Sequence, residues 1–115
     1  MMSRTAVRVL MALLCGAVWP GLPLAAQGLP TYTITARDGR LWPERLEVPA
    51  GVRIKLVLIN EGRQPVEFEN LGMRVEKVLA PGATSFVVLP VLRPGRYEFI
   101  DEFHMDTGRV WVVAR

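Results

Sequence analysis

The run VRIKLVLI at residues 52–59 decides the fold class of this chain. Arg53 and Lys55 place charge on alternate positions at its start, whereas its end is apolar at every position. Such a pattern predicts a β-strand that starts at the surface and continues into a core covered on both faces. The polar turn Asn60-Glu61-Gly62 follows directly and ends the strand.

Turn signals on either side of this run recur about every 8–12 residues, the spacing of a β-sandwich or barrel. They include Asp38-Gly39, Pro81-Gly82 and Arg93-Pro94-Gly95, the last predicted as a tight turn between two strands. The other expected strands are residues 31–36, 46–48, 66–69, 74–79, 85–89, 97–100 and 110–113. No window has helical periodicity long enough for a helix. We therefore predict an all-β Greek-key sandwich of seven to eight strands.

The first quarter of the chain differs from the rest. It has Arg4 and Arg8, then an apolar run at residues 9–18, then the small residues Ala25 and Ala26. This order is typical of a secretory signal peptide, and the run is shorter than the roughly 20 residues that span a bilayer. We predict a signal at residues 1–26 and one domain at residues 27–115; a short N-terminal membrane anchor is the alternative.

Loss of this segment changes the chemistry of the chain. Cys15 is the one cysteine of the chain and would be removed with the signal peptide. Neither a disulfide nor a thiolate metal ligand is therefore expected in the domain. Removing Arg4 and Arg8 leaves 12 basic against 11 acidic residues, and the bases are scattered. Nucleic-acid binding is therefore not expected, nor is lasting membrane insertion after cleavage.

Several motifs follow one another in an order that carries a family likeness. They are Pro43-x-x-Leu46-x-Val48-x-x-Gly51, the strand ending at Asn60, Pro81-Gly82, Pro94-Gly95-x-Tyr97-x-Phe99, His104 and Gly108-x-Val110. Together they resemble the cupredoxin superfamily. The segments FEN at residues 68–70, EKV at residues 76–78 and FIDEFHMDT at residues 99–107 are most similar to EfeO-type cupredoxin-like domains associated with bacterial iron uptake. That resemblance implies a cupredoxin-like sandwich, a periplasmic location, and binding of copper or iron.

The chain departs from a blue-copper protein at three of the four ligand positions that the resemblance implies. Val66 or Glu67 stands near the first histidine, and Asp101 stands at the cysteine. His104 is kept, but Met105 follows it directly, without the spacing of the methionine ligand. A copper–thiolate centre is therefore not expected.

The resemblance brings the loop after Asn60 and the loop before the last strand to one end of the sandwich. Carboxylates with one imidazole suit hard or borderline ions, including iron, Cu(II), Mn(II) and Zn(II). We predict a copper or iron site there, although exposed acids on a strand are also common without any ligand. The candidate ligands are His104, Asp101, Glu102, Glu69, Glu76, Glu67 and Met105.

Catalysis has no support in the sequence, which pairs no nucleophile with a histidine and has no phosphate-binding loop. We predict a non-enzyme: a periplasmic metal-binding accessory protein that passes its metal to an inner-membrane iron permease or other transporter. Two alternatives stay open. One is a metal-free interaction module of the same fold, and the other is an electron-transfer protein with a non-blue copper site.

Overall fold

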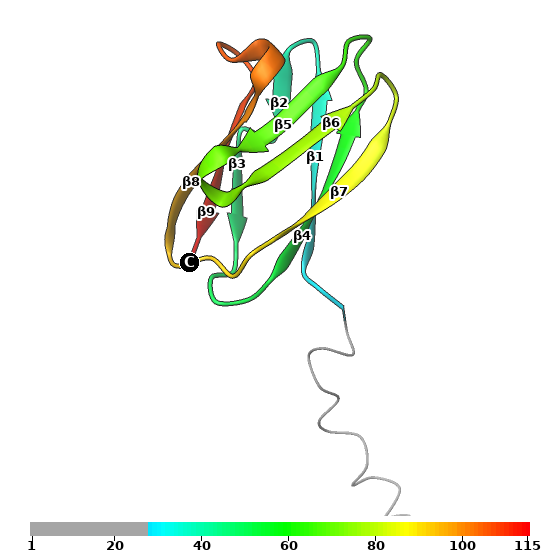
Figure 1. Ribbon diagram of the computed structural model, residues 1–115. Helices are drawn as coiled ribbons and strands as arrows, with labels where there is room; N and C mark the ends of the chain where they lie inside the picture. The colour runs from blue at the N-terminus through cyan, green and yellow to red at the C-terminus, as the bar shows by residue number, and fades with distance from the viewer. Residues whose placement is uncertain (1–27) are drawn as a thin grey trace, which may run out of the picture.

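The computed structural model describes residues 28–115, and these form a nine-stranded β-sandwich (Figure 1). One sheet has the order β2-β1-β4-β7, with β1 at Thr31–Arg37, β2 at Arg40–Trp42, β4 at Ile54–Asn60 and β7 at Thr84–Leu89. The other has the order β3-β9-β8-β5-β6, with β3 at Arg45–Val48, β5 at Val66–Asn70, β6 at Val75–Leu79, β8 at Gly95–Asp101 and β9 at Arg109–Ala114. Two 3₁₀ turns follow strands: η2 at Leu71–Met73 and η3 at Glu102–His104.

Strand β4 confirms the strand predicted from residues 52–59. It pairs in parallel with β1 and antiparallel with β7, so it lies inside its sheet. Ile54, Leu56 and Leu58 alternate into the core and are fully buried, while Val57 and Ile59 on the other face are half-buried. The strand is therefore buried on its core face only, and the expected cover on both faces is not found, because the sandwich has two layers.

The core lies between the two sheets. Phe68 from β5 and Phe99 from β8 stack at its centre, with ring centroids 5.0 Å apart and planes 9° from parallel. Both rings are almost completely buried, so each contributes the large apolar area that aromatic residues bring to a core. Because Phe68 points inward, its neighbours Glu67 and Glu69 point to the opposite face of the sheet.

One strand was not expected from the sequence. β2 is only three residues long and pairs with β1 across a two-residue turn. Asp38 and Gly39 in that turn have φ angles of 54° and 75°, which fits the turn type preferred between right-twisted strands. Three residues are too few for alternation to be recognised, so the ninth strand is visible only in the sheet.

The segment before β8 also differs from expectation. Residues 85–89 and 97–100 were predicted to be joined by a tight turn, but β7 and β8 belong to different sheets. Residues 90–94 therefore cross from one sheet to the other. Leu92 is 4% exposed within this crossing, and its carbonyl accepts from the Gly51 amide at 2.9 Å. The crossing places Leu92 at the end of the core, which it closes. A local turn motif does not indicate which sheet the next strand will join.

The predicted signal peptide and Cys15 lie outside the described residues. Within residues 28–115, no helix is long and apolar enough to cross a membrane. The turn η3 and the loop that joins β4 to β5 lie at the same end of the sandwich, away from the C-terminus (Figure 1). This end, together with the adjoining outer face of β5 and β6, holds the candidate ligands.

Candidate metal centre

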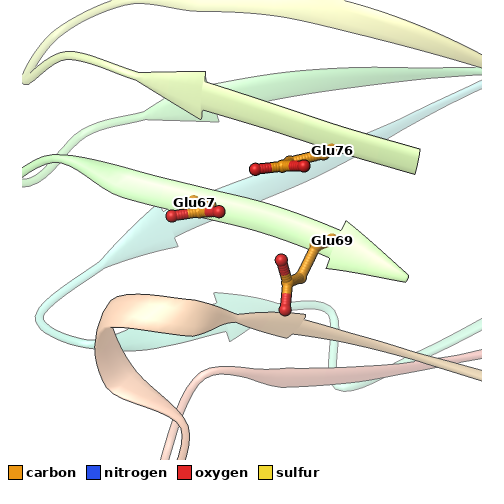
Figure 2. Close-up of side chains that lie close together, drawn as sticks. All are labelled: Glu67, Glu69 and Glu76. Atoms are coloured by element: carbon orange, nitrogen blue, oxygen red, sulfur yellow. The ribbon is translucent and has the colours of Figure 1, made fainter. Parts of the chain in front are cut away.

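Three glutamates gather on the outer face of β5 and β6 (Figure 2). Glu69 and Glu76 are directly opposed in the antiparallel ladder, and Glu67 lies two residues earlier on the same face as Glu69. One carboxylate oxygen from each of the three lies within 4.8 Å of the others. Glu69 is 5% exposed, Glu67 is half-buried and Glu76 is exposed. We call these three residues with Glu102 the carboxylate cluster.

Glu102 joins the group from η3. Its carboxyl group lies within hydrogen-bonding reach of that of Glu69, and the two share a hydrogen bond when one of them is protonated. They meet because η3 follows β8 and β8 lies beside β5 in the sheet. The cluster thus combines side chains from β5, β6 and η3, separated by up to 35 positions along the chain. A cation held here would be reached from solvent on the Glu76 side.

No basic side chain neutralises the cluster. In residues 28–115, none of the ion pairs and none of the hydrogen bonds from N–H donors involves the carboxylates of Glu67, Glu69, Glu76 or Glu102. Five of the seven other acids in the described domain are paired; Arg109, for example, contacts both oxygens of Glu98 at 3.1–3.2 Å. Carboxylates packed together without donors repel one another unless they share protons or a cation.

The surroundings of Glu69 and Glu67 raise the pKa of both carboxyl groups. The hydrogen bond with Glu102, then burial, then the neighbouring negative charges raise the pKa of Glu69 from its ordinary 4.5 to about 7. A hydrogen bond with Glu76, followed by burial and the nearby carboxylates, raises the pKa of Glu67 in the same direction. The cluster therefore retains protons that a bound cation would displace, so cation binding and proton release are coupled.

A second group lies at the end of the sandwich, on the core side of β8. Asp101 is 1% exposed. Its Oδ1 accepts from the amides of Glu67 and Phe103 at 3.1 and 3.0 Å, and its Oδ2 lies 2.8 Å from Nδ1 of His104. Because a carboxylate only accepts, Nδ1 carries the shared hydrogen. The other ring nitrogen, Nε2, lies 2.8 Å from the side-chain amide oxygen of Gln64.

The predicted ligands therefore form two groups rather than one. Asp101 pairs with Phe68 in the ladder and faces the core, whereas Glu69, one position further, faces outward. Glu67, Glu69, Glu76 and Glu102 come together outside; Asp101 and His104 come together at the end. Met105 follows η3, is 49% exposed, and accepts from Nε of Arg109 through its carbonyl oxygen. Metal binding by any of these residues stays a prediction.

Gln64 and Asn60 are the members of the second group that sequence reasoning did not include among site residues. Asn60 is 1% exposed, and its Nδ2 donates to the Gln64 carbonyl at 2.8 Å and to the Leu79 carbonyl at 3.2 Å. The sequence signal that could have identified Asn60 was its position at the end of a strand predicted to be buried. Gln64 carried none, because it lies in a polar loop 40 positions from His104.

A cleft of about 540 Å³ opens beside His104, between the β1–β2 turn and the loop after β4. Its charged lining consists of Arg37, Arg40, Arg63, Asp38, Glu61 and Asp101. Since three basic groups face three acidic ones, this cleft has no charge bias comparable to that of the carboxylate cluster.

Comparisons with known proteins agree with this fold. A family model described as "Cupredoxin-like domain" matches residues 8–113. The uncharacterized protein RP394 of Rickettsia prowazekii (strain Madrid E) is 32% identical over 81 residues, which are 70% of this chain and 65% of that protein. The chain thus spans slightly less than two thirds of the length of this relative.

Solved structures extend the likeness at the level of the fold. Reduced auracyanin from Roseiflexus castenholzii matches with a TM-score of 0.62 and 14% identity, over 76% of this chain and 99% of that one. The metal-binding domain of the Cu(I)-exporting P-type ATPase CopA from Streptococcus pneumoniae D39, determined with Cu(I), matches with a TM-score of 0.64 and 14% identity, over 83% and 91%. At these identities the likeness concerns the fold alone.

Proposed function

The chain belongs to the cupredoxin-like domain family, and we propose that it is a metal-binding accessory protein that holds a hard cation in its carboxylate cluster. The observation that carries this proposal is Glu69. The residue is 5% exposed, and its carboxylate has no basic partner in the described domain and faces the carboxylates of Glu67, Glu76 and Glu102. A cation would remove the repulsion that this arrangement creates.

The donor set favours some ions over others. Carboxylate oxygens are hard ligands, which suit Mn(II) and iron better than Cu(I). A blue-copper centre does not fit these residues, because the only cysteine lies in the predicted signal and Asp101 stands where the thiolate would be. Iron is our physiological candidate, since the segments around Glu69 and Glu102 resemble domains associated with iron uptake. Cu(II) is the competing ion from the same resemblance.

The place of the protein in the cell is part of the proposal. The predicted signal peptide supports export to the periplasm, and the resemblance to iron-uptake domains supports delivery to an inner-membrane iron permease or other transporter. The half-exposed position of Glu67 and the exposed position of Glu76 leave one side of the cluster open. Such an opening suits an ion that must later be released.

Calorimetric titration of the purified protein with Mn(II), Cu(II) and, without oxygen, Fe(II) tests the proposal. We expect one saturable ion per chain and a loss of affinity of about tenfold or more in Glu69→Gln, because one charged ligand is removed. Glu47→Gln is the matched control, since Glu47 lies on β3 and pairs with Arg45 and Arg115 away from the cluster. It should bind as the wild type does.

Two results would sink the proposal. The first is no heat above buffer dilution with any of the three ions. The second is equal affinity in Glu69→Gln and the wild type. The first result would favour the metal-free interaction module as the function of this domain.

A further inference from the structure

The turn η3 carries Glu102 but has little packing of its own. It is three residues long, contains no buried residue, and exposes half of Phe103. Several of its hydrogen bonds stay within its own loop: the amides of Thr107 and Gly108 donate to the His104 carbonyl, and Arg109 donates to the Met105 carbonyl. These contacts shape the loop but do not hold it against β5.

Two side-chain contacts, from Asp101 at the start of this loop and from His104 within it, connect the loop to β5 and to the segment before β5. Oδ1 of Asp101 accepts from the Glu67 amide at 3.1 Å, and Nε2 of His104 lies 2.8 Å from the Gln64 amide oxygen. The Gln64 backbone is in turn fixed by Asn60, which also bonds to the end of β6 through the Leu79 carbonyl. The network thus ties together β4, β5, β6 and η3, including all three elements that carry the carboxylate cluster.

Both ring nitrogens of His104 are already engaged in this network. Binding a cation through either nitrogen would break a contact to Asp101 or to Gln64. The ring also packs closely against Gly39: a Cβ added at this glycine would lie 3.1 Å from Cδ2 of His104. The side chain is placed as a bridge between segments, with no nitrogen directed at the carboxylate cluster.

We propose that His104 is a positioning residue for the carboxylate cluster: by bridging Asp101 and Gln64 it holds η3 against β5, and so keeps Glu102 in contact with Glu69. This inference rests on the proposed function and refines it. It assigns the histidine of the chain to support of the site and leaves ligation to carboxylates. Mutation of residues that orient metal ligands typically lowers metal affinity by about 10–100-fold.

A double-mutant cycle with Mn(II) as the probe tests this role, using calorimetry on the wild type, His104→Ala, Glu102→Gln and the double variant. We expect each single change to weaken Mn(II) binding about tenfold. The double variant should be within about twofold of Glu102→Gln alone, because His104 acts through Glu102. Independent, additive losses would overturn the inference and identify His104 as acting separately.

A spectroscopic measurement distinguishes bridging from ligation directly. Electron paramagnetic resonance of the Cu(II)-loaded wild type should lack nitrogen hyperfine coupling from an imidazole. Coupling that is present and disappears in His104→Ala would overturn the inference. Gln64→Ala provides a milder variant at an exposed residue, and we expect about threefold weaker Mn(II) binding, again only while Glu102 is present.

A core variant controls for general loss of stability. Val110 is fully buried in the core and lies opposite Phe99 in the β8–β9 ladder, so Val110→Ala should destabilise the fold but leave Mn(II) affinity within about twofold. An equal loss of affinity in Val110→Ala and His104→Ala would overturn the positioning role. Absence of Mn(II) binding in the wild type would overturn the proposed function itself, whereas wild-type binding with additive losses overturns only this inference.

Discussion

Asp101 and Glu69 are the two buried acids in residues 28–115, and their surroundings are opposite. Asp101 accepts hydrogen bonds from two backbone amides and the His104 ring, whereas Glu69 faces other carboxylates. They are one ladder position apart, on opposite faces of the same sheet. A buried acid surrounded by donors stabilises the fold, while a buried acid without donors is unfavourable until a cation arrives.

The largest effect on stability is expected from replacing Asp101, the buried acid whose carboxylate accepts several hydrogen bonds. Asp101→Ala leaves the Glu67 and Phe103 amides and Nδ1 of His104 without their acceptor, so we expect a loss of about 3 kcal/mol in the free energy of unfolding. Urea unfolding followed by circular dichroism measures it. A loss below about 1 kcal/mol would contradict the structural role assigned to Asp101.

A steric change behind Asp101 should have the next largest effect. A Cβ at Gly108 would lie 2.7 Å from Cβ of Asp101 and 3.1 Å from the His104 carbonyl oxygen. Gly108→Ala should therefore destabilise the domain by about 2 kcal/mol through overpacking. In the matched control Gly72→Ala, the added Cβ meets only the Asn70 side-chain oxygen, at 3.4 Å. Equal unfolding midpoints for the two variants would refute this explanation.

The unpaired acid should make stability depend on pH in the metal-free protein. The folded state holds the Glu69 proton more tightly than the unfolded chain, because its pKa is raised from 4.5 to about 7. The free energy of unfolding therefore falls as pH rises through that window and levels off above it. We expect the melting temperature to drop by about 5 °C, measured by calorimetry with a chelator present. A rise over the same window would contradict the prediction.

The smallest effect on stability is expected from Glu69→Gln, and its direction should be opposite to that of Asp101→Ala. Glu69→Gln removes a charge that is repelled by its neighbours, so we expect the metal-free protein at pH 8 to gain about 3 °C in melting temperature. Most of the pH dependence should disappear with it. The same substitution weakens metal binding in our proposal. A variant that melts earlier than the wild type at pH 8 would show that Glu69 stabilises the fold as Asp101 does.

Eight of the nine strands could be predicted from the sequence, because alternation and turn residues are local signals. The run at residues 52–59 shows this most clearly, since its alternate residues Ile54, Leu56 and Leu58 form the buried face of β4. β2 escaped because three residues carry no period. The crossing at residues 90–94 was not predicted, because a proline-glycine turn does not indicate whether the next strand joins the same sheet or the opposite one.

The sequence identified the acids of the site as candidate ligands, but it did not predict which of them lie together. Glu67, Glu69 and Glu76 were expected to meet Asp101 and His104 in one place, and the structure puts them on another face. Side-chain direction alternates at every strand position, so the one-residue offset between Asp101 and Glu69 in the β5–β8 ladder separates the two groups. Register between distant strands depends on tertiary packing.

By itself, the sequence determined an all-β sandwich and an acid-rich pair of segments near its one histidine. Only the tertiary structure decided that His104 spans from Asp101 to Gln64, 40 positions earlier in the chain, and that Glu69 is buried among carboxylates. Composition and local periodicity specify which elements form. Which face each side chain occupies, and which charges meet there, follows from how the two sheets pack around Phe68 and Phe99.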